Sequence, residues 1–179
     1  MSAISKESDV IQIAALVSEA LERAGITAVL SGGATVSIYS EAKYKSYDLD
    51  FVTSAHKKKI LEALSELGFE TEGRYLAHPE TKYFLDFLTG PLAVGNEVIK
   101  NWARLETNYG TIQILTPTQC VMDRLAAFYH WRDPQGLDQA LMVARKHKID
   151  VTGIKKWSSK EGFADSFEIF ARQLDKITK

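Results

Sequence analysis

The fold is decided by two short segments, Leu30-Ser31-Gly32-Gly33 and Tyr47-Asp48-Leu49-Asp50-Phe51-Val52. The apolar run 26–30, which ends in the first segment, predicts a buried strand, and the glycine pair that follows precedes a short helix over 34–39. The second segment alternates with period two, which predicts a strand with both aspartates on one face. A strand, a glycine turn, a helix and an acidic strand are therefore expected in direct succession.

The sequence around these segments predicts further elements of an α/β core. Ser8 and Asp9 precede apolar residues at helical spacing, which Gly25 ends, and an amphipathic helix over 57–67 ends at Gly68. Shorter apolar runs predict the remaining strands, over 69–72, 82–88, 103–107 and 111–115.

The pattern changes at Thr116-Pro117. From there on the apolar residues recur only at helical spacing, over 121–131, 137–146, 153–157 and 163–177. The fold class predicted is therefore α/β (α+β): a mixed sheet flanked by helices over residues 1–115, followed by a C-terminal helical region over 116–179 that packs on this core.

The composition is that of an ordinary globular protein, with 45% apolar and 25% charged residues among 179. The formal net charge of −1 gives no overall positive potential for nucleic acid and leaves room only for a local basic groove. The single cysteine, Cys120, excludes a disulfide framework and a cysteine-based zinc site, and its apolar surroundings predict a buried thiol. Because neither a secretory signal nor a membrane-spanning apolar run is present, we predict a cytoplasmic protein with no membrane partner.

Asp48, Asp50 and Asp86 are the candidate catalytic and metal-binding residues. Two carboxylates on one strand face repel each other, and each favours protonation unless a cation lies between them. Asp86 stands in the apolar segment 83–88, where an ionised carboxylate is costly unless it is paired or bound to metal. Mg²⁺ or Mn²⁺ prefers oxygen ligands, and three carboxylates at one sheet edge can hold two such ions for phosphoryl transfer.

Simpler interpretations exist for each part of this set. An Asp-x-Asp pair alone is more often part of a solvated strand face or a turn, and Asp86 alone could pair with an arginine. The glycines change this interpretation, because Gly32 and Gly33 follow a predicted strand and precede a predicted helix. Their N–H groups can approach a phosphate closely at the positive end of that helix. A phosphate-binding turn and metal-binding carboxylates in one unit indicate a site for a metal–nucleotide complex.

The two opening segments, together with Asp86 on a later strand, resemble the signature of the polymerase-β-type nucleotidyltransferase superfamily. That signature is an apolar residue, Gly, then Gly or Ser, a short helix, and Asp-apolar-Asp. The run 45–51, Lys-Ser-Tyr-Asp-Leu-Asp-Phe, is similar to the branch that contains abortive-infection toxin–antitoxin nucleotidyltransferases. This resemblance implies that Asp48 and Asp50 bind the metal ions and that Asp86 activates the acceptor hydroxyl. The residues that it implies at the nucleotide are Ser31, Gly32, Gly33, Lys45, Ser46 and Arg124.

Two of these residues depart from the family pattern. Many relatives have a lysine where Arg124 stands in the helical region, and an arginine is more usual where Lys45 stands. Arginine keeps the charge at position 124 and adds a bidentate pair of donors for the triphosphate, but it cannot act as a proton shuttle.

The function predicted from the sequence is metal-dependent transfer of a nucleoside monophosphate from a nucleoside triphosphate. The acceptor, which is a tRNA, a protein or a small molecule, is left open. The alternative is a catalytically inactive nucleotide-binding or regulatory module, which the departures at Lys45 and Arg124 and the short C-terminal region leave open. A toxin–antitoxin component is compatible with either function, as is a partner protein or a homo-oligomer.

Other candidates for chemistry have structural explanations. The four histidines are scattered without metal-ligand spacing. Lys57-Lys58-Lys59 is interpreted as a solvated helix start. Three tyrosines near the acidic strand are expected to pack rather than to stack on a base, namely Tyr39, Tyr44 and Tyr47. The tryptophans are expected in the core or at an interface, namely Trp102, Trp131 and Trp157.

Overall fold

A mixed sheet of seven strands organises residues 3–179, which are the residues that this computed structural model describes. Its strands are β1 (Val29–Ser31), β2 (Asp48–Thr53), β3 (Glu70–Glu72), β4 (Tyr75–Ala77), β5 (Phe84–Thr89), β8 (Ala103–Thr107) and β9 (Gly110–Ile114). They lie in the order β3-β4-β5-β2-β1-β9-β8, and a separate ribbon pairs β6 (Ala93–Val94) with β7 (Glu97–Val98). The β2–β5 and β1–β9 pairs are parallel and the other pairs are antiparallel.

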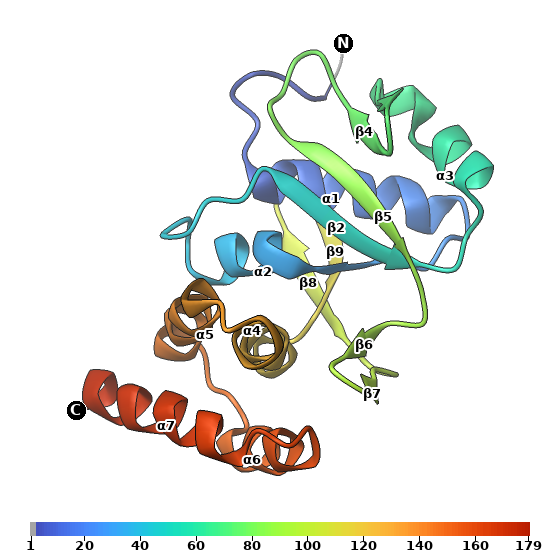
Figure 1. The fold of residues 1–179 in the computed structure, drawn as a ribbon. Coiled ribbons are helices and arrows are strands. Elements are labelled where there is room, and N and C mark those ends of the chain that lie inside the picture. Colours follow the sequence, from blue (N-terminus) through green and yellow to red (C-terminus); the bar gives the residue numbers. More distant parts are fainter. Residues whose placement is uncertain (1–2) are drawn as a thin grey trace.

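The helices divide between the core and the C-terminal region. Those of the core are α1 (Val10–Arg23), α2 (Gly32–Tyr39) and α3 (Lys57–Leu64), which continues into a 3₁₀ turn, η1 (Ser65–Leu67). Those of the C-terminal region are α4 (Pro117–Trp131), α5 (Pro134–Lys146), α6 (Val151–Lys160) and α7 (Ala164–Thr178). In Figure 1 the sheet and α1 form the upper part of the molecule, and α4 to α7 form a helical layer below α2. The predicted fold class is confirmed.

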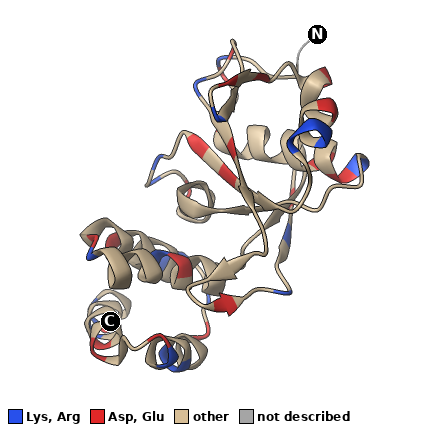
Figure 2. Ribbon diagram, turned by 45° about the vertical axis from the view of Figure 1, so that its right-hand side comes forward, with Lys and Arg blue, Asp and Glu red and all other residues tan. Residues whose placement is uncertain are grey.

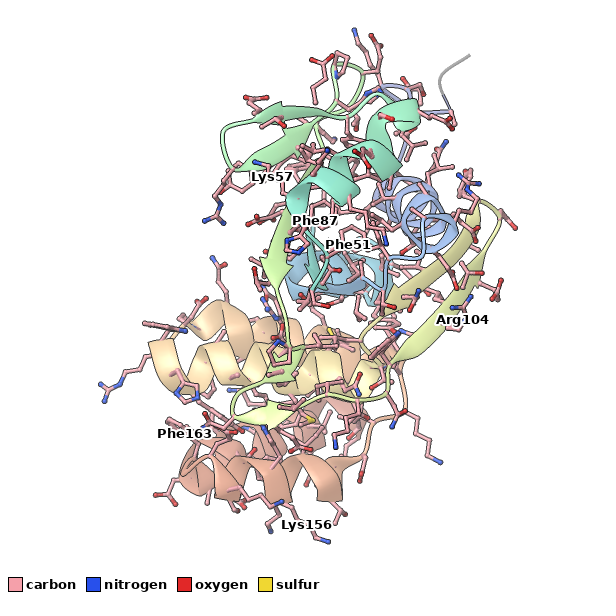
Figure 3. All side chains as sticks on the ribbon, turned by 90° about the vertical axis from the view of Figure 1, so that its right-hand side faces the viewer. Phe51, Lys57, Phe87, Arg104, Lys156 and Phe163 are labelled. Atoms are coloured by element: carbon pink, nitrogen blue, oxygen red, sulfur yellow. The ribbon has the colours of Figure 1, made fainter. Side chains whose placement is uncertain are left out.

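The buried face of β2 shows how the sheet is held. Leu49 and Phe51 are fully buried, and the Phe51 ring stacks on Phe87 of β5 with their centroids 5.6 Å apart (Figure 3). Because side chains alternate along a strand, burying these two residues turns Asp48 and Asp50 to the opposite face. The apolar core therefore sets the direction of the acidic residues.

Polar contacts join the helical layer to the core. Thr35 Oγ1 in α2 lies 3.1 Å from Cys120 Sγ in α4, and the Tyr39 hydroxyl donates to the Leu115 carbonyl oxygen at 2.6 Å. Cys120 is fully buried, and burial raises the pKa of its thiol to about 12. The thiol is therefore protonated at neutral pH, and the prediction of a buried structural cysteine is confirmed.

Some expectations about single elements were wrong. The first strand begins at Val29, three residues later than predicted, and β4, β6 and β7 were missed because strands of two or three residues show no periodicity. Trp131 is not in the core, since it is 82% exposed at the end of α4, where the chain turns away through Arg132 at φ 52°; its place at an interface stays a prediction. Tyr47 is 41% exposed, but its ring packs against that of Tyr83 with the centroids 5.7 Å apart, as expected.

The charges are spread over the molecule. Figure 2 shows acidic and basic segments interspersed along the ribbon. Among the described residues, 3–179, no helix is both long and apolar enough to cross a membrane.

The close approach of α4 and α5 at Gly136 gives a first prediction. A Cβ at Gly136 would lie 2.5 Å from the Arg124 carbonyl oxygen and 2.9 Å from the Phe128 nitrogen. Alanine favours a helix over glycine by about 1 kcal/mol, but backbone atoms cannot rotate away, and overpacking costs about 1–3 kcal/mol. We therefore expect Gly136→Ala to lower the free energy of unfolding in urea.

The exposed neighbour Gln135 provides the matched control, since Gln135→Ala should change the unfolding free energy by less than about 0.5 kcal/mol. A Gly136→Ala variant as stable as the wild type would contradict the tight packing of α4 on α5.

Candidate active site

Three carboxylates lie side by side on the sheet. The parallel register of β2 and β5 pairs Asp50 with Asp86, and the antiparallel register of β1 and β2 pairs Asp50 with Ser31. Asp48 is two residues before Asp50 on β2 and projects from the same face. The structure thus brings together four residues that the sequence analysis placed at the site.

Two of the carboxylates have partners within the chain. Ser46 Oγ donates to Asp48 Oδ1 at 2.8 Å. Asp86, whose side chain is 9% exposed, forms an ion pair with Arg74, whose side chain is 68% exposed. The buried charge of Asp86 is therefore compensated by an arginine that solvent can reach.

Asp50 is next to both of the other acids, and both affect its pKa. Its pKa is raised from 3.8 to about 6, first by burial and then by the negative charges of Asp48 and Asp86, while the positive charge of Arg124 acts in the opposite direction. A cation that approaches Asp50 stabilises the ionised form of its carboxyl group. In charge and in ligand type, the set therefore fits a divalent ion that prefers oxygen ligands.

The carboxylates are not gathered around one point. Within residues 3–179, no group of three or more His, Cys, Asp or Glu side chains is arranged to hold a metal ion. Asp48 is turned toward Ser46 and Asp86 toward Arg74. Because Arg74 contacts Oδ2 of Asp86, it competes with a metal ion for that oxygen.

The glycine turn lies directly beside Asp50. Gly32 adopts φ +67°, and a Cβ there would lie 2.6 Å from Asp50 Oδ2, so both the backbone conformation and the space require glycine. A Cβ on Gly33 would meet Ser46 Oγ and Tyr44 Cε1, each at 3.2 Å. No side chain caps the start of α2. Its first N–H groups are therefore suited to an anion such as a phosphate.

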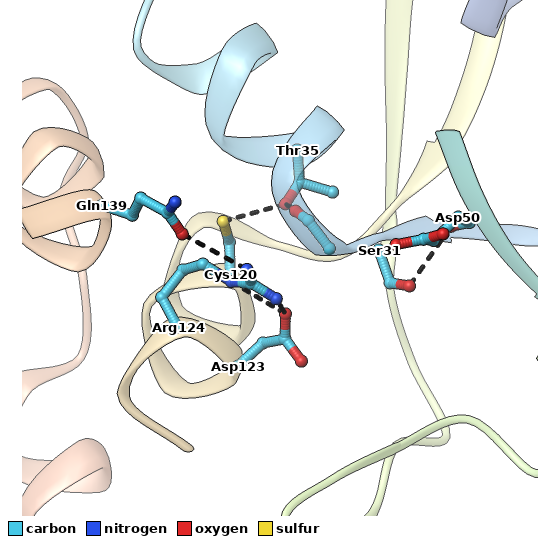
Figure 4. Close-up of polar contacts among 8 residues, drawn as sticks. Ser31, Thr35, Asp50, Cys120, Asp123, Arg124 and Gln139 are labelled. Atoms are coloured by element: carbon cyan, nitrogen blue, oxygen red, sulfur yellow. Dashed lines mark hydrogen bonds and ion pairs between the residues drawn. The ribbon is translucent and has the colours of Figure 1, made fainter. Parts of the chain in front are cut away.

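Arg124 reaches the site from the helical layer. It forms an ion pair with its neighbour Asp123 and donates to Gln139 Oε1 at 3.3 Å (Figure 4). Its charge lowers the pKa of Asp50, whereas that of Asp123 raises it. The positive charge of Arg124 therefore favours the ionised form of Asp50, as expected of a residue beside the site. Asp123 partly neutralises this charge.

Ser46 and Lys45 belong to the segment before β2. Ser46 is buried, and its N–H donates to Ser37 Oγ at 2.9 Å while its hydroxyl holds Asp48. Lys45 is exposed, and the structure does not bring its ammonium group into an ion pair with the carboxylates of the described chain. Their expected role at a nucleotide stays a prediction.

Sequence analysis missed Arg74. The isolated Asp86 was a signal that a partner exists, because a buried carboxylate needs one. The partner follows Gly73 in the turn between β3 and β4, and the three-residue strand β4 was not predicted. Only the pairing of β4 with β5 shows that Arg74 lies next to Asp86.

Comparison with known proteins supports this description of the fold. Neither a protein-family model nor a curated protein sequence matches the chain. A nucleotidyltransferase-like protein from Paracoccidioides brasiliensis has a similar structure, with a TM-score of 0.57 and 13% identity over 79% of this chain and 78% of that one. The chain has a nucleotidyltransferase-like fold. The resemblance seen in the sequence is confirmed at the level of the fold.

Two other solved structures are less similar to this nucleotidyltransferase-like chain. The antibiotic-resistance factor ANT(2'')-Ia matches with a TM-score of 0.49 and 12% identity, over 93% of this chain and 95% of that one. A tRNA-processing enzyme matches with a TM-score of 0.38 and 18% identity, over 90% of this chain and 50% of that one. These scores are too low to support an inference about activity, and the toxin–antitoxin branch stays a prediction.

The raised pKa of Asp50 leads to a prediction about stability. Because the pKa rises from 3.8 to about 6 on folding, the folded state binds this proton more tightly, and stability falls as pH rises through that range. Asp50→Asn removes the ionisation. In chelator, we expect it to raise the melting temperature relative to the wild type, by a difference that grows between about pH 4 and pH 6 and is constant above about pH 7.

The control is Asp138→Asn, which changes an exposed aspartate in α5 and should show no such pH-dependent gain. An Asp50→Asn variant that melts with the wild type at every pH would mean that Asp50 is not destabilised by its neighbours.

Proposed function

We propose that the chain is a nucleotidyltransferase that uses Mg²⁺ or Mn²⁺ to move a nucleoside monophosphate from a nucleoside triphosphate to an acceptor. The observation that supports this most strongly is the in-register row of Ser31, Asp50 and Asp86, which continues into the Gly32 turn. The nucleotidyltransferase-like fold is consistent with this function. Acidic groups and an uncapped glycine turn therefore lie next to each other, which supports the binding of a metal–nucleotide complex there.

The nucleotide would bind at the start of α2. The N–H groups beside Gly32 and Gly33 would donate to the phosphate oxygens, aided by the positive end of the helix. Arg124, 19% exposed at its side chain, would contact the outer phosphates from α4. In doing so its guanidinium would exchange part of its contact with Asp123 for the triphosphate.

The carboxylates have distinct roles in this proposal. Asp48 and Asp50 would hold the divalent ion, and Asp86 would complete its ligands or stand next to them. Bound at these residues, such an ion neutralises charge on the transferring phosphate. Ser46 would keep Asp48 in position through its 2.8 Å hydrogen bond.

The transfer itself would exchange a phosphoanhydride bond of the nucleotide for a phosphoester bond to the acceptor. The acceptor oxygen forms a bond to the α-phosphorus, the bond from that phosphorus to pyrophosphate breaks, and Asp86 takes the proton of the acceptor hydroxyl. Opening of the ion pair with Arg74 would raise the proton affinity of Asp86.

A catalytically inactive nucleotide-binding or regulatory module is the second candidate. Two ion pairs favour it, Arg74 with Asp86 and Arg124 with Asp123. They pair Asp86 and Arg124 with residues of the chain instead of leaving them free for a substrate. Such a module would bind a metal–nucleotide complex without turning it over.

Gly33 gives a test of nucleotide binding. The Cβ of alanine would meet only side-chain atoms of Tyr44 and Ser46 at 3.2 Å, which can move by a few tenths of an ångström, whereas valine adds two methyl groups in that space. We expect Gly33→Val to abolish binding of Mg²⁺–nucleoside triphosphate in calorimetry, and Gly33→Ala to weaken it less. The circular dichroism spectra should remain those of the wild type, and undiminished binding by a folded Gly33→Val would exclude the phosphate-binding turn.

Asp86 gives a test of turnover. Asparagine keeps the shape of the side chain but cannot accept the proton, so Asp86→Asn should bind metal–nucleotide with a modest loss and transfer no label. The assay incubates purified protein with each α-labelled nucleoside triphosphate, Mn²⁺ and cell extract, and follows label on RNA, protein and small molecules.

The outcome separates the two candidates. Label transferred by the wild type and not by Asp86→Asn supports the enzyme. A wild type that binds nucleotide tightly and labels nothing supports the inactive module, and equal labelling by both proteins would show that Asp86 is not the base.

A further inference from the structure

The outer edge of β5 is only partly covered by its neighbour in the sheet. β4 is three residues long and pairs with β5 at Phe84 and Leu85. Residues 87–89, in the second half of β5, pair with β2 on one side, but no other strand of the described chain, 3–179, pairs with them on the other. Space is therefore left between this edge and the start of α3.

A cavity of about 130 Å³ occupies this space. Its apolar walls include Ile60 of α3 and Leu76 of β4, which are both buried, and Phe87 of β5. Figure 3 shows Phe87 close to Lys57 at the start of α3, and Lys57 also lines the cavity. Because an apolar cavity of about 150 Å³ can bind benzene, there is room here for one small ring or a short aliphatic group.

The charged residues that line the cavity are both basic. They are Lys57 and Arg74, and no aspartate or glutamate of the described chain, 3–179, lines it. Lys57 is exposed and forms no ion pair with another described residue. A cationic ligand would be repelled by these two groups, whereas an anion would form charge-assisted hydrogen bonds with them. The cavity therefore fits a ligand that has a small apolar group and a negative charge.

We propose that this cavity is an effector site for a small organic carboxylate, which competes with Asp86 for Arg74. The apolar group of the ligand lies against Phe87, and its carboxylate contacts Lys57 and the Arg74 guanidinium. The Arg74 side chain is 68% exposed, so it can turn from one carboxylate to the other without moving a buried group.

Arg74 connects the cavity to the candidate active site. In the free chain it contacts Oδ2 of Asp86 and so competes with a metal ion for that oxygen. A carboxylate that takes the guanidinium frees this oxygen and neutralises a positive charge beside the site, so the metal ion binds more tightly. By linkage, the metal ion raises the affinity for the carboxylate by the same factor. This regulation rests on the proposed function, because it requires a metal ion at the carboxylates, whereas binding of the effector does not.

The probe for the cavity is benzoate, which is a benzene ring with one carboxylate. It is titrated into ¹⁵N-labelled protein, and we expect saturable changes in amide chemical shift at residues 57–61 and 87–89. Acetate lacks the ring and benzyl alcohol lacks the charge, so each should bind at least roughly tenfold more weakly than benzoate.

Two neighbouring lysines test the position of the charge. Lys57→Ala should weaken benzoate binding roughly tenfold, because it removes a charged hydrogen-bond donor. Lys58→Ala is the matched control, since Lys58 is exposed on the same helix but does not line the cavity, and it should bind benzoate as the wild type does. Shift changes confined to other parts of the chain, equal affinity for benzyl alcohol, or an undiminished affinity in Lys57→Ala would overturn the site.

The coupling is measured by titrating Mn²⁺ with and without saturating benzoate and following the electron paramagnetic resonance signal of free Mn²⁺. We expect benzoate to raise the Mn²⁺ affinity of the wild type about fivefold or more. Arg74→Ala should bind Mn²⁺ more tightly than the wild type without benzoate and should not respond to its addition. An unchanged Mn²⁺ affinity of the benzoate-saturated wild type would overturn the competition for Arg74.

These measurements separate the effector site from the proposed function. A chain that binds metal–nucleotide and no benzoate would overturn the effector site and leave the nucleotidyltransferase intact. A chain that binds benzoate through Lys57 and binds no Mn²⁺ would refute the proposed metal-dependent function and support the anion-binding cavity.

Discussion

The site depends on the burial of Leu49 and Phe51 in β2. With both side chains in the core, alternation along the strand leaves Asp48 and Asp50 no direction other than the opposite face. The parallel register with β5 then places Asp86 beside Asp50, and the pairing with β1 brings the glycine turn to the same point. A shift of β2 by one residue would bury two carboxylates and dismantle the site.

This arrangement concentrates negative charge, and the groups around the carboxylates partly compensate it. Ser46 donates a hydrogen bond to Asp48, Arg74 neutralises Asp86, and the charge of Arg124 opposes the rise in the pKa of Asp50. Asp50 is the least compensated of the three acids. The destabilisation that it introduces in the free protein is the same feature that would attract a cation, so stability and binding are opposed at this position.

The order of the strands also determines the sides from which the two substrates of the proposed reaction would approach the carboxylates. The glycine turn lies on the β1 side of the carboxylates, and the rings of Tyr75 and Phe84 lie on the β4 side. Donor and acceptor would therefore approach Asp86 and Asp50 from opposite sides, as an in-line displacement requires.

The sequence by itself determined the elements of the core, the glycine turn and the shared face of Asp48 and Asp50, because helical and strand periodicity and αL glycines are local properties. It also indicated that Asp86 needs a partner. Only the tertiary structure decided that the partner is Arg74, that Ser46 holds Asp48 and that Trp131 is exposed. These depend on which strands and helices become neighbours, and short strands such as β4 carry too few residues to reveal their pairing before the chain has folded.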